Sequence, residues 1–478
     1  MKQNAAWIAV ALMISGCPSC GEPPACGDLA WFDLSGCSLS TLRDLQLEGA
    51  WNMELRLGSS RSTSTFSFID SAAPTLHGYP ARLERDSDSF LLETQYRTAG
   101  QLTRHVYAGC RAPSADQVEG PFARCAVGGS SAVQGTFVAK RVRRLPGEAE
   151  AQSFTLLGEI GFPGATTADV FVSGTLAYVV LFTDGAAIVD VTNPAAPALV
   201  ARIPADNDYW NAVWVKDQTL YLASAEEGVI FYDVATPTAP VLLGAVPGGA
   251  INVHTLFLDG NTLYAMSPDP VTDTLIFDVT QARTPVLRSR FRAPDADHHA
   301  DRFPHDATAF AGRLYVNHWA SGLIAVDVSD PTRPSELGRF VYPSATSHAS
   351  KVGSFGGRTI VFEGGESWDA HLRVLDATDP ASIAEIGAVS LRPEVSIHNL
   401  ELRGSRLYVA WYQDGLRAFD VSVPASPTAI GYFNTWRESD PGRGASFYEG
   451  AIGVRAPGDG RVYVAETERG LLILGEPP

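Results

Sequence analysis

The sequence predicts an all-β protein: a seven-bladed β-propeller preceded by a small antiparallel β barrel or sandwich. The 478-residue chain is rich in turn-forming and strand-forming residues, with 44 Gly, 31 Pro and 15 Tyr. Its last two thirds repeat a unit of four short apolar segments separated by turns. Its first third lacks the repeat and carries all six cysteines. A unit of this size cannot bury its own faces, so its copies must stack on one another.

The N-terminal segment has the features of an export signal. One lysine precedes the apolar run Ala5–Met13, and Ile14-Ser15-Gly16-Cys17 follows. We therefore assign residues 1–16 to a signal peptide. This ending resembles the lipobox of bacterial lipoproteins, with Ile14 where Leu is usual, and the resemblance implies lipidation of Cys17. The alternative is an ordinary secreted protein in which Cys17 lies inside a longer signal.

Residues 17–44 are small, polar and cysteine-rich, as expected of a tether behind a lipid anchor. We predict a disulfide between Cys110 and Cys125, because they bracket a polar loop between two predicted strands. The partners of Cys20, Cys26 and Cys37 stay open. If Cys17 carries lipid, one remaining cysteine is unpaired or bridges to another chain. No cysteine follows Cys125, so the repeats must be stabilised by packing alone.

Residues 45–144 form the predicted small β domain. Six segments alternate apolar and polar residues between polar turns, which is typical of antiparallel strands: Trp51–Leu57, Thr65–Ile69, Ala81–Arg85, Phe90–Tyr96, Thr103–Tyr107 and Thr136–Arg141. We expect His77 and His105 of this domain to lie on its surface. Residues 145–153 read as a linker to the repeats.

The repeat is clearest between Ile397 and Phe433, where four apolar segments are separated by three turns. In six copies the third segment ends in an aspartate, which we expect to cap the following turn: Asp190, Asp233, Asp278, Asp327, Asp376 and Asp420. Their spacings of 43, 45, 49, 49 and 44 residues are in the range of propeller blades. A seventh unit, from Ala451 to Leu474, lacks a fourth strand. Residues 154–160 match the missing strand, so we expect them to close a propeller that spans 154–478.

The sequence Ile188-Val189-Asp190-Val191, with its Asn193-Pro194 turn, resembles the LVIVD-repeat family of bacterial propellers. The resemblance covers about Phe154 to Leu474. It implies export and a surface or envelope role. Together with the lipobox resemblance, it implies a location in the bacterial cell envelope, lipid-anchored at the outer membrane or cell surface. It implies no shared reaction and no catalytic motif.

Four of the ten histidines fall at one position of the repeat, just before the predicted innermost strand. These are His254, His305, His348 and His398, and Asn211 has the same offset in the second unit. We expect them at one mouth of the central channel, together with Trp319, Trp411 and Glu449, as a ligand-binding site. Neutral imidazole is the commonest metal ligand, so the four histidines are also a candidate site for zinc, copper or iron. His298, His299 and Asp301 would be accessory ligands.

Composition and motifs limit the function further. A net charge of −17 excludes nucleic acid as a partner. Hydrolase, zinc-protease, phosphate-loop and dinucleotide motifs are absent from the sequence. Our first hypothesis is a lipid-anchored envelope scaffold, held at the membrane, that binds a protein, glycan or small molecule through the His-rich face. The second is a metal-dependent oxidoreductase or hydrolase with Glu363 or Glu449 as base or ligand, and the sequence favours the non-enzymatic hypothesis.

Overall fold

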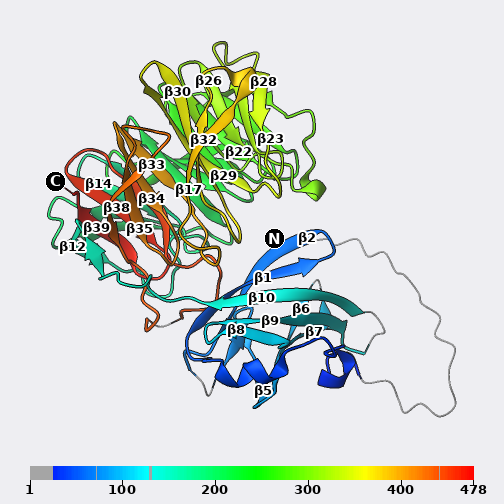
Figure 1. The fold of residues 1–478 in the computed structure, drawn as a ribbon. Coiled ribbons are helices and arrows are strands. Elements are labelled where there is room, and N and C mark those ends of the chain that lie inside the picture. Colours follow the sequence, from blue (N-terminus) through cyan, green and yellow to red (C-terminus); the bar gives the residue numbers. More distant parts are fainter. Residues whose placement is uncertain (1–24, 71–72, 99, 129–131, 441, 478) are drawn as a thin grey trace. The chain divides into compact units, whose positions relative to one another are not determined.

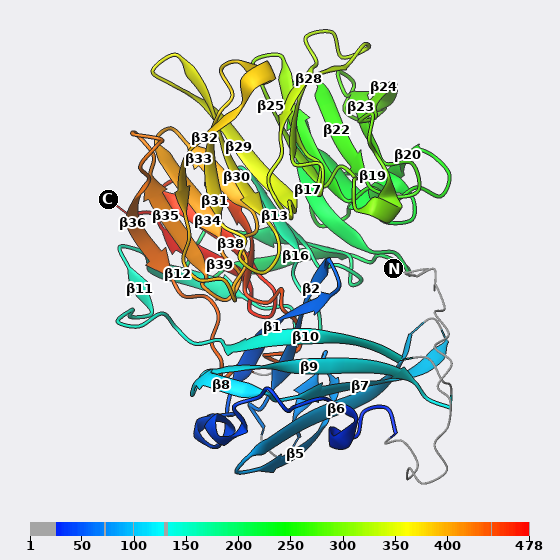
Figure 2. The same cartoon turned by 45° about the vertical axis from the view of Figure 1, so that its right-hand side comes forward.

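The computed structural model describes residues 25–70, 73–98, 100–128, 132–440 and 442–477 (Figures 1 and 2). Cys17 and Cys20 lie outside these residues, as does the signal segment. The described residues form 39 strands and four short 3-10 helices, so the protein is all-β. The chain divides into two units, residues 1–143 with 437–447, and residues 144–436 with 448–478. A short segment that follows Trp436 therefore belongs to the first unit.

The first unit is built on one antiparallel sheet with the order β4-β3-β2-β1-β10-β9-β7-β6-β5, and β8 pairs with β9. Its strands are β1 (Ala50–Leu57), β2 (Ser60–Ser67), β3 (Thr75–Leu76), β4 (Tyr79–Pro80), β5 (Arg82–Asp86), β6 (Ser89–Thr98), β7 (Gln101–Ala108), β8 (Arg111–Ser114), β9 (Gln117–Ala126) and β10 (Ala132–Arg141). The Thr94 hydroxyl of β6 donates to the Pro80 carbonyl of β4 at 2.7 Å, so the sheet curls into a nearly closed barrel. Trp51, Phe66 and Phe122 are fully buried inside it.

His105 of β7 is only 4% exposed, so the expectation that it lies on the surface is wrong. It faces inward because it is two residues from Tyr107, whose ring belongs to the buried core.

The predicted Cys110–Cys125 disulfide is wrong. The structure pairs Cys26 with Cys125 and Cys37 with Cys110. The Cys110 N–H donates to the Glu119 carbonyl of β9, so Cys110 lies beside Glu119. Cys125 is six residues further along the same extended strand, roughly 20 Å away at about 3.3 Å per residue. Both disulfides instead fasten the segment before β1 to the sheet.

The second unit consists of seven sheets that form the blades of a propeller (Figures 1 and 2). Blades one to six are β13–β16, β17–β20, β21–β24, β25–β28, β29–β32 and β33–β36, and blade seven is β37–β39 with β12. The first strands of successive blades contact one another in a closed cycle, β13 meeting β37, so these strands surround the axis. β12 (Thr155–Ile160) pairs with β39 (Gly470–Gly475) and supplies the fourth strand of the last blade. β11 (Ala151–Gln152) extends blade six beside β36.

The bounds of the propeller strands follow the repeat. They are β13 (Asp169–Ser173), β14 (Leu176–Val180), β15 (Ala186–Asp190), β16 (Ala198–Ile203), β17 (Trp210–Lys216), β18 (Thr219–Ser224), β19 (Gly228–Asp233), β20 (Val241–Pro247), β21 (Thr255–Asp259), β22 (Thr262–Ser267), β23 (Asp273–Asp278), β24 (Val286–Phe291), β25 (Asp306–Phe310), β26 (Arg313–Asn317), β27 (Leu323–Asp327), β28 (Ser335–Phe340), β29 (Ser347–Phe355), β30 (Arg358–Gly365), β31 (Leu372–Asp376), β32 (Ala384–Val389), β33 (Leu400–Arg403), β34 (Arg406–Ala410), β35 (Leu416–Asp420), β36 (Thr428–Phe433), β37 (Ala451–Arg455) and β38 (Arg461–Glu466).

The repeated aspartates cap turns, as the sequence predicts. Each ends the third strand of its blade and accepts a backbone N–H from the residue two positions later, at 2.8–3.0 Å. Hydrogen bonds from neighbouring side chains, together with these backbone N–H groups, hold the pKa of all six carboxyls below the usual value for aspartate. The turn that follows carries the chain to the outermost strand.

Glycines in outer strands allow neighbouring blades to pack closely. A Cβ on Gly158 of β12 would lie 2.1 Å from the Pro194 carbonyl oxygen, which belongs to the capped turn of blade one. Gly338 of β28 stands at the same distance from the Pro380 carbonyl oxygen of blade five. No side chain fits at either position, because real Cβ atoms do not approach backbone this closely. The Gly at this position of the repeat is therefore required for blade packing.

Candidate metal centre at the mouth of the propeller channel

The four histidines of the repeat occupy equivalent positions at the start of the innermost strands of blades three to six. His254 and His305 immediately precede β21 and β25, His348 is the second residue of β29, and His398 lies two residues before β33. The backbone N–H groups of His254, His305 and His398 each donate to the last or next-to-last residue of the adjacent second strand: Met266, Asn317 and Ala410. The register of the repeat thus carries each imidazole to the same level of the channel.

The four imidazoles form a continuous arc. The ring centroids of His254 and His305 are 4.3 Å apart, those of His305 and His348 are 4.2 Å apart, and those of His348 and His398 are 4.2 Å apart. Asn211 extends the arc, because its Nδ2 lies 3.3 Å from Nε2 of His254 and also donates to the His254 carbonyl at 3.1 Å.

His305, His348, His398 and Asn211 of the arc line a cavity in the channel. Ala168 and Ile452 of blades one and seven line the same cavity, as do the charged Asp169 and Arg455 of these two blades. The cavity has a volume of about 40 Å³. A single water needs roughly 10–15 Å³, so this space accepts a few waters or one ion, and an organic substrate does not fit inside it.

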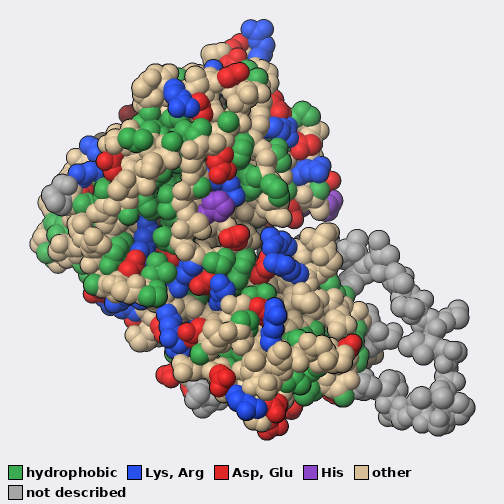
Figure 3. Space-filling view, viewed as in Figure 1, with side chains coloured by type: hydrophobic (Ala, Val, Ile, Leu, Met, Phe, Trp, Pro, Cys, Tyr) green, Lys and Arg blue, Asp and Glu red, His purple; other side chains and the backbone are tan. Residues whose placement is uncertain are grey.

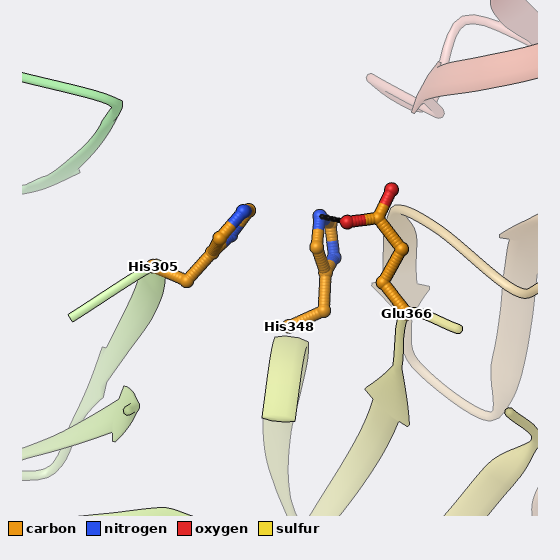
Figure 4. Close-up of side chains that lie close together, drawn as sticks. All are labelled: His305, His348 and Glu366. Carbon is orange, nitrogen blue, oxygen red and sulfur yellow. Dashed lines mark ion pairs between the residues drawn. The ribbon is translucent and has the colours of Figure 1, made fainter. Parts of the chain in front are cut away.

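Glu366, which immediately follows β30, lies over two of the imidazoles. Its Oε2 is 3.7 Å from Nε2 of His348, and its Oε1 is 3.7 Å from Nε2 of His398. One ring nitrogen each of His305 and His348 and one oxygen of Glu366 all lie within 4.8 Å of one another (Figure 4). The Tyr412 hydroxyl donates to Oε1 of Glu366 and fixes the carboxylate. This spacing is close to that of the ligands around one metal ion, so small side-chain movements would bring all three groups to a single ion.

The hydrogen bonds leave several imidazole nitrogens available. His398 Nδ1 is 2.5 Å from the Ile452 carbonyl oxygen, which only accepts, so Nδ1 carries the proton. Its Nε2 then presents a lone pair to the Glu366 side of the mouth. Nδ1 of His305 and both ring nitrogens of His348 are buried without a hydrogen-bond partner. Because buried polar atoms are nearly always satisfied, these three nitrogens are candidates to bind an ion or a water at the mouth.

Burial keeps these imidazoles neutral. It lowers the pKa of His254 to about 4 and that of His398 to about 3. Burial, followed by the neighbouring imidazoles, holds the pKa of His305 and of His348 well below the usual value. Burial also raises the pKa of Glu366 to about 7. The site thus offers uncharged nitrogen donors at neutral pH, and a carboxylate with no Lys or Arg ion pair among the described residues; both suit a metal ion.

Aromatic side chains border the arc. Trp319 stacks on His305 with centroids 5.1 Å apart, and Tyr412 lies 4.9 Å from His398. Both residues have left-handed backbone angles, with φ of 40° and 27°, as does Phe182 of blade one at 46°. Such angles are costly for bulky residues and are concentrated at functional sites. The structure places Tyr412 beside the histidines, and Tyr412 and Trp411 are both fully buried.

The other predicted site residues lie outside the three-residue group. Glu449 accepts a hydrogen bond from Nε1 of Trp436 at 3.2 Å. Glu363 accepts one from the Tyr342 hydroxyl at 2.9 Å and lies 3.5 Å from Arg373. The accessory residues are in an exposed segment at the short helix η3 (His298–Ala300): His298, His299 and Asp301. Glu366 belongs to the site but was not among the site residues predicted from the sequence. It follows the second strand of its blade, as Trp319 and Tyr412 do in theirs.

Further along the innermost strands, the channel is charged. Arg455 of β37 lies 3.9 Å from Asp169 of β13 and 3.8 Å from Glu401 of β33. Burial lowers the pKa of Lys351, three residues beyond His348, and raises the pKa of Asp306 to about 6. The imidazoles are therefore backed by buried ionisable groups of both signs.

This fold and repeat define a seven-bladed β-propeller built with LVIVD repeats. The LVIVD repeat model matches residues 164–204, 312–341 and 397–435, which fall in blades one, four and six. Two solved structures show the same fold at low identity. They are a chain of the mitotic checkpoint complex (12% identity, 70% of this chain and 98% of that one, TM-score 0.50) and the WD40 propeller domain of Doa1 (11%, 67% and 97%, 0.50). No curated protein matches the chain.

Two findings bear on location. The two disulfides indicate an extracellular or exported protein, because disulfides persist in oxidising compartments. Among the described residues, no helix is both long enough and apolar enough to cross a membrane.

Proposed function

We propose that this protein is an exported binding propeller whose ligand is a divalent transition-metal ion held at the channel mouth. His305, His348 and Glu366 are the proposed ligands, with His398 as a fourth. The observation that carries the proposal is the set of buried, unpartnered ring nitrogens on His305 and His348 beside the half-buried Glu366 carboxylate. An ion would satisfy those nitrogens and neutralise the carboxylate together.

The types of donor atom limit which ions the site can bind. Imidazole and carboxylate suit zinc, copper and iron, whereas magnesium and calcium prefer all-oxygen sites. The Tyr412 hydroxyl bonded to Glu366 supplies the outer contact that orients ligating carboxylates. The 40 Å³ cavity is too small for an organic molecule, so any larger partner would contact the rim, where the half-buried Trp319 lies.

Elemental analysis tests this proposal. The purified exported protein would be exposed separately to zinc, copper and iron, dialysed, and measured for bound metal. We expect about one ion per chain for at least one metal and its loss in the His305→Ala, His348→Ala double variant. His298→Ala, His299→Ala removes two exposed histidines outside the group and should leave the metal content unchanged. Wild-type protein that retains none of the three metals would overturn the proposal.

We also propose that lipidation of Cys17 anchors the protein to the cell envelope. The supporting observations are the Ile14-Ser15-Gly16-Cys17 sequence and the disulfides of an exported protein. Fractionation of cells should find wild-type protein with membranes and the Cys17→Ser variant in the soluble fraction. Equal membrane association of both would refute the anchor and leave the metal proposal untouched.

A further inference from the structure

A stack of aromatic rings leads from one of the proposed metal ligands to an exposed residue. The Trp319 ring stacks on His305, with centroids 5.1 Å apart and 28° between the planes. The Phe303 ring stacks on Trp319 at 5.7 Å and 18°. His298, which is exposed, lies 5.9 Å from Phe303. Ring contacts therefore run without a break from the buried imidazole of His305 to the surface.

Backbone hydrogen bonds hold this stack in place. Trp319 belongs to blade four, but its N–H donates to the Ser347 carbonyl of blade five at 3.2 Å, and its carbonyl accepts from the Ser347 N–H at 3.1 Å. Ser347 immediately precedes His348, a second proposed ligand. The Ala320 N–H donates to the Asp301 carbonyl at 3.0 Å, which fastens the segment that carries Phe303. The rings are thus fixed relative to both proposed histidine ligands.

The position of Trp319 in the repeat is structural, and the indole ring is what distinguishes it. Phe182 of blade one and Tyr412 of blade six occupy the same position, also have left-handed backbone angles, and also pair with the start of the next blade. Phe182 stacks on Tyr209 at 4.8 Å and contacts no imidazole of the described residues. An indole gives up an electron more readily than a phenyl ring does. Trp319 places such a ring directly against a proposed metal ligand.

The size and charge of the site suit electron transfer. The cavity of about 40 Å³ beside the imidazoles has no room for an organic substrate, whereas an electron can cross packed side chains. Neutral imidazoles and one carboxylate would leave copper(II) with one positive charge and copper(I) with none. Because burial disfavours charge, such a site favours reduction of copper(II). Zinc has no second oxidation state to offer.

We propose that the metal centre is an electron-transfer site that holds copper, and that Trp319 and Phe303 form the path between His305 and a one-electron redox partner. The inference rests on the proposed metal site. One electron passes from a reduced donor to copper(II), which gives copper(I) and the donor oxidised by one electron. No bond forms or breaks, and no proton moves. Redox partners need only a small contact area, and residues 297–303 offer an exposed one.

Stopped-flow reduction of the copper-loaded full exported chain tests the inference. The donor is hexaammineruthenium(II), a one-electron reagent too large for the cavity, and loss of the copper(II) absorbance is followed. We expect the wild type to take up one electron per copper. Trp319→Leu and Phe303→Leu should each lower the rate at least tenfold with the copper content unchanged, and Trp319→Tyr should keep part of it. The matched control, Phe182→Leu, should react as the wild type does.

The outcomes separate this inference from the proposed metal site. Wild-type protein that holds zinc or iron but no copper overturns the inference alone, and protein that holds none of the three metals overturns both. Bound copper that the donor fails to reduce also overturns it. So do equal rates in the wild type and Trp319→Leu at equal copper content. If Trp319→Leu loses its copper, Phe303→Leu decides, because Phe303 has no ring contact with a proposed ligand; a wild-type rate there overturns the path.

Discussion

His348 and Glu366 face each other at the mouth of the channel, with Nε2 of the histidine 3.7 Å from Oε2 of the glutamate (Figure 4). The histidine comes from the innermost strand of blade five, and the glutamate immediately follows the second strand of the same blade. One hairpin thus supplies both a nitrogen and an oxygen donor. Blades four and six add His305 and His398 on either side.

The first prediction concerns Glu366. Burial of this carboxylate without a cation is unfavourable, so Glu366→Gln should leave the thermal stability of the metal-free protein equal or higher. The same substitution removes the anionic ligand and should weaken metal binding at least tenfold. Differential scanning calorimetry of chelator-treated and metal-loaded samples measures both effects. A variant that gains as much stability from metal as the wild type would show that Glu366 is not a ligand.

The second prediction concerns the close approach of blades four and five. Gly338→Ala places a Cβ against the Pro380 carbonyl oxygen and should cost about 1–3 kcal/mol by overpacking. Gly161→Ala is the matched control in the same unit, since its Cβ would find only the Arg469 carbonyl oxygen at 3.5 Å. Denaturant unfolding should therefore separate the two variants. Equal free energies of unfolding for the two variants would show that blades four and five can move apart at little energetic cost.

The third prediction concerns the buried Arg417 of β35. Its Nη2 donates to Glu148 and Asn434 at 3.0 Å, and its Nε donates to the Asp414 carbonyl at 2.8 Å. Arg417→Met would leave Glu148 without this cation and should cost about 3–5 kcal/mol. Arg333→Met, at an ion pair whose arginine is 84% exposed, should change stability by less than about 1 kcal/mol. Equal losses in the two variants would contradict this account of blade six.

The fourth prediction is a pH dependence of the first unit. Burial, followed by the charge of Arg124, lowers the pKa of His105 to about 4, from 6.5 in the unfolded chain. Between pH 6.5 and 4 the unfolded chain takes up a proton that the folded chain does not. Stability is therefore full above pH 6.5 and falls as the solution is acidified, by roughly 2–3 kcal/mol for this group.

His105→Phe removes that titration, so the variant should lose less stability than the wild type between pH 7.5 and pH 4.5. The free energy of unfolding of the first unit, measured in the full chain at both pH values, checks this. His298→Phe serves as the control, because His298 is exposed. If the wild type and His105→Phe lose stability equally on acidification, His105 does not titrate as its burial implies.

The propeller could be predicted from the sequence because its determinants are local and repeated. A strand quartet with an aspartate-capped turn recurs six times, and each aspartate accepts the same N–H in the structure. Strand register then follows from alternation along each segment, which carries His254, His305 and His398 to one level. A one-residue slip would have turned these side chains to the other face.

The features that could not be predicted from the sequence depend on contacts between residues that are far apart in the chain. The disulfides join cysteines 99 and 73 residues apart, and nothing in the local spacing of Cys110 and Cys125 shows that β9 separates them. The burial of His105 depends on the curl of the sheet, which brings β4 to β6. Glu366 was not selected because its orientation depends on the Tyr412 hydroxyl of the next blade.

Charge on the surface gives little further guidance. On the face shown in Figure 3, acidic and basic side chains are intermixed. The net charge of −17 is thus not gathered into one acidic patch on that face.

The most direct test of the metal centre is an anomalous difference map from crystals of the metal-loaded protein, collected at the absorption edge of the bound ion. We predict a single peak at the channel mouth, about 2.0–2.2 Å from a ring nitrogen of His305, a ring nitrogen of His348 and an oxygen of Glu366. A map with no peak among these three residues, in crystals that bind the metal elsewhere or not at all, would contradict the account.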